Sequence, residues 1–200
     1  MTRGRYPFRA FPLALILSAI FAFSLFSMSV ASALTQSRAT DLSGNPIDPL
    51  KSSPGKIVIL IFVRTDCPIS NRYAPTIQHL SAQYSQNASF FLVYPARTEF
   101  TAQIRKHESD FNYKLPALRD PNHVLVKQSH ATITPEAAVF DANHHLIYHG
   151  RIDDLYQDFG RARSAPTTHE LDDAIRAAIS GKPLATGTAP AVGCYISDLE

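Results

Sequence analysis

The sequence predicts an α/β domain in which a central mixed sheet lies between layers of helices, and three observations carry this prediction. Residues 57–63 are an unbroken run of apolar, mostly β-branched residues, which is typical of a central strand covered on both faces. Apolar residues then recur at helical spacing, at Tyr73, Ile77, Leu80 and Tyr84. A second apolar run follows at residues 89–95, so strand, helix and strand should form a right-handed βαβ unit with parallel strands.

Two further helices and a hairpin are expected along the chain. Residues 98–109 read as a helix, and residues 118–130 read as a shorter one that Asp120 caps and whose first turn contains Pro121. Residues 135–153 alternate as a hairpin whose turn lies near residues 141–144.

A closing helix is expected to follow a capping box. Thr167 and Glu170 have the spacing of such a box. The apolar residues of one helical face come after them: Leu171, Ala174, Ile175, Ala178 and Ile179.

Residues 1–33 have the pattern of an export signal. Three arginines precede an apolar stretch at residues 11–30, which ends in the small residues of an A-x-A cleavage site at 31–33. Cleavage would leave a chain that begins at Leu34, is periplasmic or secreted, and is not stably inserted in a membrane. The alternative is retention as an anchor, because ~20 apolar residues can span a bilayer.

The rest of the chain divides into a domain at residues 34–182 and an irregular, proline-containing tail at residues 183–200. The whole chain carries a formal charge of +2, and residues 1–33 hold three arginines and no acidic residue, so the remainder carries −1. Nucleic-acid-binding domains carry a basic patch, so no nucleic-acid partner is expected. Two cysteines are too few for a disulfide scaffold, but a pair can persist in an oxidising compartment.

Cys67 is the leading candidate for chemistry. It follows a buried strand and precedes a helix, and the carboxyl ends of strands are where open α/β sheets place their sites. A helix N-terminus favours an anion, so the pKa of this thiol should lie below about 8.5, although the neighbouring carboxylate of Asp66 opposes this unless it points away. Cys67 can thus be a reactive thiol, half of a structural disulfide, or a small residue of the core.

The stretch DCPISNRYAPTIQHLSAQY resembles the active-site helix of the thioredoxin-like superfamily, with a kinking proline, Pro75, eight residues after the first cysteine. The stretch from Tyr113 to Asp153 resembles the second half of the redoxin branch, which includes TlpA-like and AhpC/thiol-specific-antioxidant domains. The resemblance covers about residues 41–182 and implies a three-layer thioredoxin-like fold. It also implies that Pro135 is a cis-proline beside the sulfur of Cys67, and that the backbone of Thr134 pairs with an extended substrate.

The chain departs from the family pattern at two places. Ser70 occupies the position of the second cysteine, where its hydroxyl can hydrogen-bond a thiolate at Cys67. Leu60 and Arg64 stand where peroxiredoxins carry a proline and a hydroxyl, so ordinary peroxiredoxin activity is not expected. Cys194 can replace the missing cysteine by swinging in on the tail, or it can pin the tail as a static bridge.

The sequence therefore indicates a thiol-disulfide oxidoreductase that needs no cofactor and acts on protein or small-molecule thiols and disulfides. Cys67 would be the nucleophile and Cys194 the possible resolving cysteine. One alternative is a non-catalytic binding module with a structural disulfide. Another is a copper-handling protein that binds Cu(I) through Cys67, Cys194 and a histidine, although the Cys-x-x-x-Cys pair of exported copper chaperones is absent. His144 and His145 are expected in an exposed turn and not in a metal site.

Overall fold

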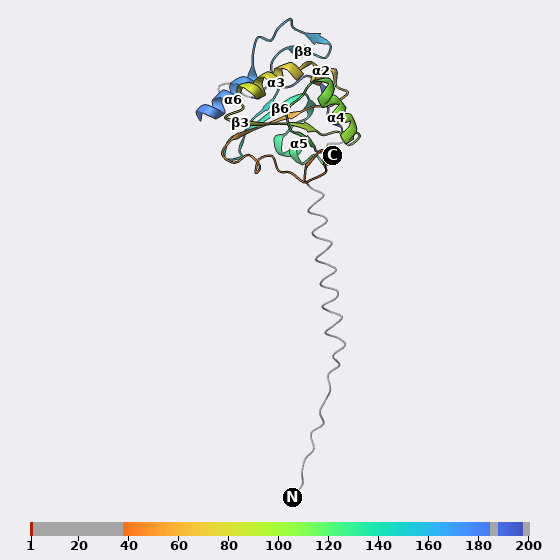
Figure 1. Ribbon diagram of the computed structural model, residues 1–200. Coiled ribbons are helices and arrows are strands. Elements are labelled where there is room, and N and C mark those ends of the chain that lie inside the picture. The colour runs from red at the N-terminus through yellow and green to blue at the C-terminus, as the bar shows by residue number, and fades with distance from the viewer. Residues whose placement is uncertain (2–37, 185–187, 198–200) are drawn as a thin grey trace. The chain divides into compact units, whose positions relative to one another are not determined.

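The computed structural model describes residues 38–184 and 188–197 together with Met1 (Figure 1). The expected export signal at residues 1–33 falls outside the described part of the domain. Among the described residues, no helix combines the length and the apolar composition needed to span a bilayer.

A six-stranded mixed sheet forms the centre of the domain, in the order β1-β4-β3-β2-β6-β7. Its strands are β1 (Thr40–Asp41), β2 (Ile57–Phe62), β3 (Ala88–Tyr94), β4 (Ala117–Arg119), β6 (Glu136–Phe140) and β7 (Leu146–Gly150). The helices are α2 (Pro68–Arg72), α3 (Ala74–Gln83), α4 (Thr101–Asp110), α5 (Val124–Ser129) and α6 (Glu170–Ser180). Two small sheets pair β5 (Ile133–Thr134) with β10 (Cys194–Tyr195), and β8 (Tyr156–Asp158) with β9 (Arg161–Ala162).

The predicted βαβ unit is confirmed, because β2 and β3 are parallel neighbours joined through α2 and α3. β6 pairs with the other edge of β2 in antiparallel register and continues into β7, which confirms the predicted hairpin. The sheet is therefore mixed, as expected.

Strand β2 is buried on both faces, and its alternate residues enter two separate clusters of the core. Ile57, Ile59 and Ile61 pack in the cluster that contains the buried residues of α3 and α6. Val58, Leu60 and Phe62 pack in the cluster that contains Leu125 and Val126 of α5. Figure 1 shows α3 and α6 on one side of the sheet and α5 on the other. Helices on both faces explain why β2 is apolar throughout and does not alternate.

Four local expectations differ from the structure, and the first concerns the helix after Cys67. The helix expected after Cys67 and Pro68 is broken at Tyr73, which ends α2 and precedes α3. Pro75 lies in the first turn of α3, where a missing N–H breaks no intrahelical bond. The proline therefore separates two helices instead of kinking one.

The helix predicted at residues 118–130 begins later than expected. Residues 117–119 form β4, a strand that the sequence analysis missed, and α5 starts only at Val124. Pro121 lies in the preceding turn and not in the first turn of the helix. Asp120 does cap α5, because its carboxylate accepts the backbone N–H groups of Val124 and Val126 at 2.8 and 3.0 Å.

The capping box expected before α6 does not form. The residue before α6 is His169, and the Thr167 hydroxyl donates instead to the carboxylate of Asp154. Competition from this buried carboxylate, which also accepts the backbone N–H of Thr168, explains the difference.

The C-terminal tail is docked where it was expected to be irregular. Cys194 and Tyr195 form β10, and the next residue, Ile196, is only 5% exposed in the same cluster as Leu125 and Val126. Apolar burial and backbone pairing thus hold a segment whose composition suggested a loop.

Candidate functional site

Cys67 lies where the central strand gives way to a helix. It is the N-terminal cap of α2, with Pro68 in the first turn, as the sequence predicted. Three polar residues separate it from Val63, so the chain leaves the sheet at the carboxyl end of β2 before the helix begins. Its side chain is nevertheless 0% exposed.

The loop before β6 lies against the Cys67 sulfur. The peptide bond between Thr134 and Pro135 is cis. The carbonyl oxygen of Thr134 lies 3.2 Å from the Sγ atom of Cys67 and accepts a hydrogen bond from the thiol. The backbone of Thr134 therefore contacts the sulfur, and the cis bond to Pro135 follows it directly.

Strand β10 brings Cys194 to the same point. It pairs with β5 in antiparallel register, with Cys194 opposite Thr134. Both cysteines are free thiols, and their Sγ atoms lie 2.7 Å apart. Two cysteines 127 residues apart in the sequence thus form one dithiol pair.

Several contacts hold β10 in this position. The backbone N–H of Ile196 donates to the carbonyl of Thr132 at 2.9 Å, and the Thr134 hydroxyl donates to the carbonyl of Cys194 at 3.2 Å. Upstream, the N–H of Arg151 donates to the carbonyl of Ala189 at 3.0 Å. In this structure the second thiol is therefore held beside Cys67 by a docked strand.

The two thiols have opposite electrostatic character. Burial raises the pKa of Cys67, but hydrogen bonds from Cys194 and Ser70 outweigh burial, and the net pKa lies below the ordinary value. Burial, the hydrogen bond to Cys67 and repulsion from its charge raise the pKa of Cys194 to about 12. Cys67 is therefore the cysteine of the pair that loses its proton first, and Cys194 is the thiol that donates to it. The direction of this shift is the one expected from the sequence, but its causes are hydrogen bonds from Cys194 and Ser70.

Ser70 stands one helical turn after Cys67 and is 0% exposed. Its Oγ atom makes no hydrogen bond of regular geometry with another described residue. Because the hydroxyl and the backbone N–H of Ser70 both lower the pKa of Cys67, this side chain is available to the sulfur. A buried hydroxyl that serves no other partner is suited to steadying a thiolate.

The carboxylate of Asp66 is paired with Arg64. It was expected to oppose a thiolate at Cys67 unless it pointed away. It is exposed and accepts a hydrogen bond from the Arg64 guanidinium at 2.9 Å. The positive charge of Arg64 lowers the pKa of Cys194, and the negative charge of Asp66 raises it. The two charges therefore largely offset each other at the dithiol.

Two buried carboxylates support the site and were missed in the sequence analysis. Glu99 accepts the backbone N–H of Thr65 at 2.5 Å, and burial raises its pKa. Glu136 accepts the N–H groups of Thr132 and Ile133 at 2.9 and 3.1 Å and so fixes β5. A signal for Glu99 was present, because it follows the parallel strand next to β2 and so lies at the same edge of the sheet.

A cleft of about 440 Å³ opens beside the second cysteine. Cys194 lines it together with Ile133, Val192 and the 69%-exposed side chain of Phe159. Solvent and small molecules therefore reach the pair from the Cys194 side.

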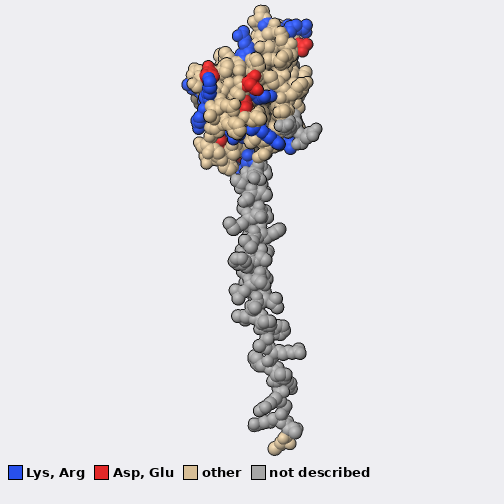
Figure 2. Space-filling view, turned by 90° about the vertical axis from the view of Figure 1, so that its right-hand side faces the viewer, with Lys and Arg blue, Asp and Glu red and all other residues tan. Residues whose placement is uncertain are grey.

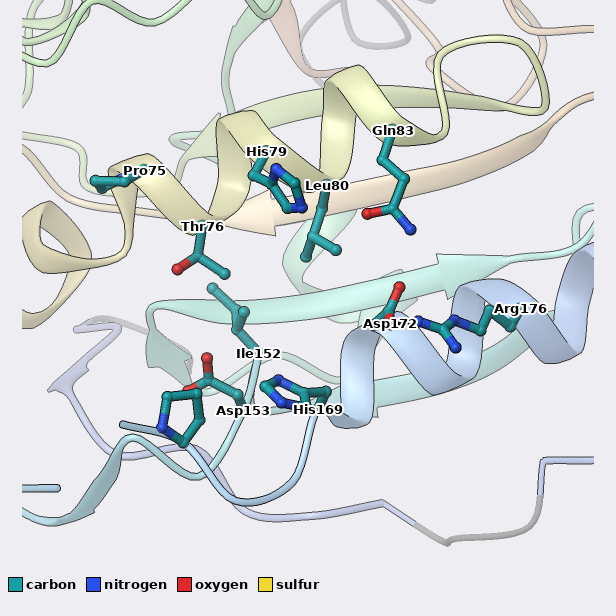
Figure 3. Close-up of a pocket in the computed structure, with 11 residues that line it drawn as sticks. Pro75, Thr76, His79, Leu80, Gln83, Ile152, Asp153, His169, Asp172 and Arg176 are labelled. Carbon is teal, nitrogen blue, oxygen red and sulfur yellow. Dashed lines mark hydrogen bonds and ion pairs between the residues drawn. The ribbon is translucent and has the colours of Figure 1, made fainter. Parts of the chain in front are cut away.

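A second cavity of about 540 Å³ lies between α3 and the start of α6 (Figure 3). His79 and Leu80 point into it from α3, facing Ile152 and His169. Neither cysteine lines this cavity, so the dithiol chemistry lies elsewhere.

The histidines do not gather at the cysteines. Within residues 38–184 and 188–197, no histidine or carboxylate joins the two thiols to make a group of three potential metal ligands. His144 and His145 lie in the exposed turn between β6 and β7, where His145 contacts the carboxylate of Asp141 at 3.2 Å. Basic and acidic side chains are interspersed on the face shown in Figure 2, so no single-sign patch dominates it.

These features define a class of protein. A buried cysteine at the start of a helix, opposite a cis-proline loop and beside a central mixed sheet, is the arrangement of thioredoxin-like proteins. The profile of the Redoxin family matches residues 29–163, which is more than half of the chain. The chain belongs to the Redoxin family. No curated protein matches it significantly.

Solved structures share the fold at low sequence identity. An uncharacterized conserved protein from Geobacillus kaustophilus superimposes with a TM-score of 0.68 at 21% identity, covering 80% of this chain and 86% of that one. The exposed lipoprotein thioredoxin Etrx1 from Streptococcus pneumoniae gives 0.52 at 20% identity, covering 71% and 96%. A secreted Mycobacterium tuberculosis disulfide oxidoreductase homologous to Escherichia coli DsbE gives 0.50 at 20% identity, covering 74% and 96%. The predicted thioredoxin-like fold is confirmed.

Proposed function

We propose that the protein is an exported thiol-disulfide oxidoreductase whose redox couple is Cys67 and Cys194. The observation that carries this proposal is the 2.7 Å separation of two free sulfur atoms at the start of α2. Its thioredoxin-like relatives include a disulfide oxidoreductase, which is consistent with the same chemistry. Protein or small-molecule thiols and disulfides would be its partners.

In the first step the Cys67 thiolate attacks one sulfur of a substrate disulfide. A bond forms between Cys67 and that sulfur, the substrate S–S bond breaks, and the other substrate sulfur leaves as a thiolate. The thiolate is the form that attacks, and the lowered pKa of Cys67 increases the fraction of thiolate near neutral pH.

In the second step Cys194 resolves the mixed disulfide. Two of the influences that raise the pKa of Cys194 come from Cys67, namely the hydrogen bond and the charge repulsion. Both disappear once the Cys67 sulfur is bonded to substrate, so Cys194 can lose its proton and attack Cys67. The second substrate thiolate leaves, and the protein retains a Cys67–Cys194 disulfide that a reductant must reopen.

Export is part of the proposal. It is supported by the signal-like pattern of residues 1–33, and two of the structural relatives are described as secreted or exposed. N-terminal sequencing of the exported protein should find Leu34, and an intact Met1 in the membrane fraction would contradict cleavage.

The redox couple is tested by titration of the protein in glutathione buffers. Peptide mass spectrometry should find a reversible linkage between Cys67 and Cys194, with a reduction potential above about −300 mV, because structural disulfides lie below that value. A potential below it, with no turnover of a disulfide substrate, would indicate the alternative of a binding module with a structural bridge. Retention of Cu(I) through gel filtration by the reduced protein alone would indicate the copper alternative.

A further inference from the structure

Strand β10 occupies the backbone edge of β5 beside the reactive sulfur. The two strands form a separate two-stranded sheet in which Cys194 lies opposite Thr134. The carbonyl of Thr132 accepts the N–H of Ile196 at 2.9 Å. If β10 left, β5 would present these groups unpaired, and an unpaired strand edge is a template for another extended chain.

Docked β10 also covers Cys67. The Cys67 side chain is 0% exposed, and its sulfur contacts the carbonyl of Thr134 and the sulfur of Cys194. A macromolecular disulfide cannot reach this sulfur while β10 is in place. Departure of β10 exposes the sulfur and the β5 edge together, so one movement opens both parts of a polypeptide site.

The residue before Cys194 shows what this site accepts. Gly193 approaches β5 so closely that a Cβ atom would collide with the carbonyl oxygen of Thr134. The residue after the cysteine, Tyr195, is 76% exposed and meets no such restriction. The site therefore excludes a side chain immediately before the reacting cysteine and tolerates a large one after it.

We propose that β10 is a displaceable occupant of a substrate-strand site on β5, and that this site takes an extended polypeptide in which glycine immediately precedes the reactive cysteine. The inference rests on the proposed function and adds a substrate class to it. The polypeptide pairs with β5 in place of residues 192–196 and presents its sulfur to Cys67.

Because β10 and the polypeptide occupy the same edge of β5, the resolving step and the release of the polypeptide occur together. When β10 returns to β5 it displaces the bound polypeptide and brings the Cys194 sulfur to the mixed disulfide. The Cys194 thiolate bonds to the Cys67 sulfur, the bond between Cys67 and the polypeptide sulfur breaks, and the polypeptide leaves as a thiolate. The same strand thus carries out the resolving step and displaces the product from the site.

A peptide of sequence AVGCYIS, which copies residues 191–197, serves as the probe. Its cysteine is activated as a mixed disulfide with an aryl thiol, and attack by Cys67 releases the coloured aryl thiolate. The control peptide, AVACYIS, differs only by an alanine in place of the glycine. The full chain is used with Cys194→Ser, so that the resolving thiol does not interfere.

Undocking is produced by adding Ile196→Ser, which removes the buried anchor of β10. With this double variant, we expect the glycine peptide to react at least 10-fold faster than with Cys194→Ser alone. We also expect it to react at least 10-fold faster than the alanine peptide. Bis(2-hydroxyethyl) disulfide reports how much the exposure of Cys67 itself changes, and the acceleration of the glycine peptide must exceed the acceleration of this small disulfide.

A second variant protects the test against misfolding. Cys194→Ser with Gly193→Ala should undock β10 through the collision with Thr134, and it leaves the buried anchor intact. In Cys194→Ser alone both peptides react only from the undocked fraction in a rapid equilibrium, so both rates are lower by the same factor and the 10-fold preference for glycine should remain.

Equal rates for the two peptides in all three proteins would overturn the proposal, as would a rate for the glycine peptide that neither undocking variant raises. Reaction with the small disulfide separates these outcomes from failure of the proposed function. If Cys67 reacts with the small disulfide but ignores the glycine, the redox function stands and the polypeptide site is wrong. If Cys67 reacts with neither, the redox function itself fails.

Discussion

Cys67 caps the helix that follows a six-residue strand buried on both faces, whereas Cys194 lies in a two-residue strand at the edge of the domain. The segment around Cys67 is held by two clusters of the core through β2. The segment around Cys194 is held by a few backbone hydrogen bonds and by Ile196. The proposed nucleophile, Cys67, is therefore fixed by the core, and its proposed partner, Cys194, is carried by a strand with few contacts.

The largest expected effect separates the two cysteines by chemistry. Cys67→Ser should lower the rate of reaction with an activated disulfide at least about 10³-fold, because it removes the thiolate that attacks. Cys194→Ser should keep the first step and accumulate mixed disulfides. Stopped-flow release of an aryl thiolate, followed by mass spectrometry, measures both, and equal losses in the two variants would contradict the assigned roles.

The second prediction separates the two regions by stability. Ile61→Ala in β2 should lower the free energy of unfolding by about 3–4 kcal/mol, because the side chain is 0% exposed in a strand that cannot leave the core alone. Ile196→Ala should lower it by only about 1 kcal/mol, because undocking of the tail limits the loss. Urea unfolding of the reduced proteins provides the measurement, and equal losses would show that β10 is part of the cooperative core.

The third prediction concerns pH. Iodoacetamide should alkylate Cys67 with a midpoint below the free-thiol value of about 8.5, and Cys194→Ala should raise that midpoint, because it removes the thiol that donates to the thiolate. A midpoint at or above 8.5 in the protein with both cysteines would contradict the lowered pKa.

The same pKa shift has a consequence for stability. Because the pKa of Cys67 is lower in the folded state, the unfolded chain binds more protons between the two values, and stability rises with pH there. This stabilisation is complete above the unfolded pKa and is lost as pH falls through the folded one. The raised pKa of Cys194 acts oppositely, and its stabilisation is lost as pH rises toward about 12. Comparison with each Cys→Ser variant of the reduced protein assigns the two contributions.

The smallest effect is expected at Ser70. Ser70→Ala should raise the pKa of Cys67 and slow its alkylation at neutral pH by about two- to ten-fold, since one hydrogen bond to a charged group is lost. The matched control is Ser81→Ala, because Ser81 lies in α3 and donates only to the carbonyl of Gln78. Equal alkylation rates in the two variants would remove Ser70 from the site.

Local sequence patterns were enough to predict the strand-helix-strand unit, the hairpin and the position of Cys67 before a helix. Each of these follows from periodicity or from proline placement within a few neighbouring residues, which act locally. The break at Tyr73, the three-residue strand β4 and the late start of α5 were not determined in this way. The strand β4 depends on pairing with β3, which is distant in the sequence, and the start of α5 depends on which backbone N–H groups the Asp120 carboxylate accepts.

The contact between Cys194 and Cys67 depends on how the tail packs against the folded domain. The sequence offered two cysteines and a tail whose composition resembled a loop, and a swinging tail and a static bridge both remained open. The register of β10 on β5, the buried Ile196 and the close approach of Gly193 bring the two sulfur atoms together. Pairing across 127 residues depends on a strand edge and a core pocket that exist only after the domain has folded, so no local pattern could encode it.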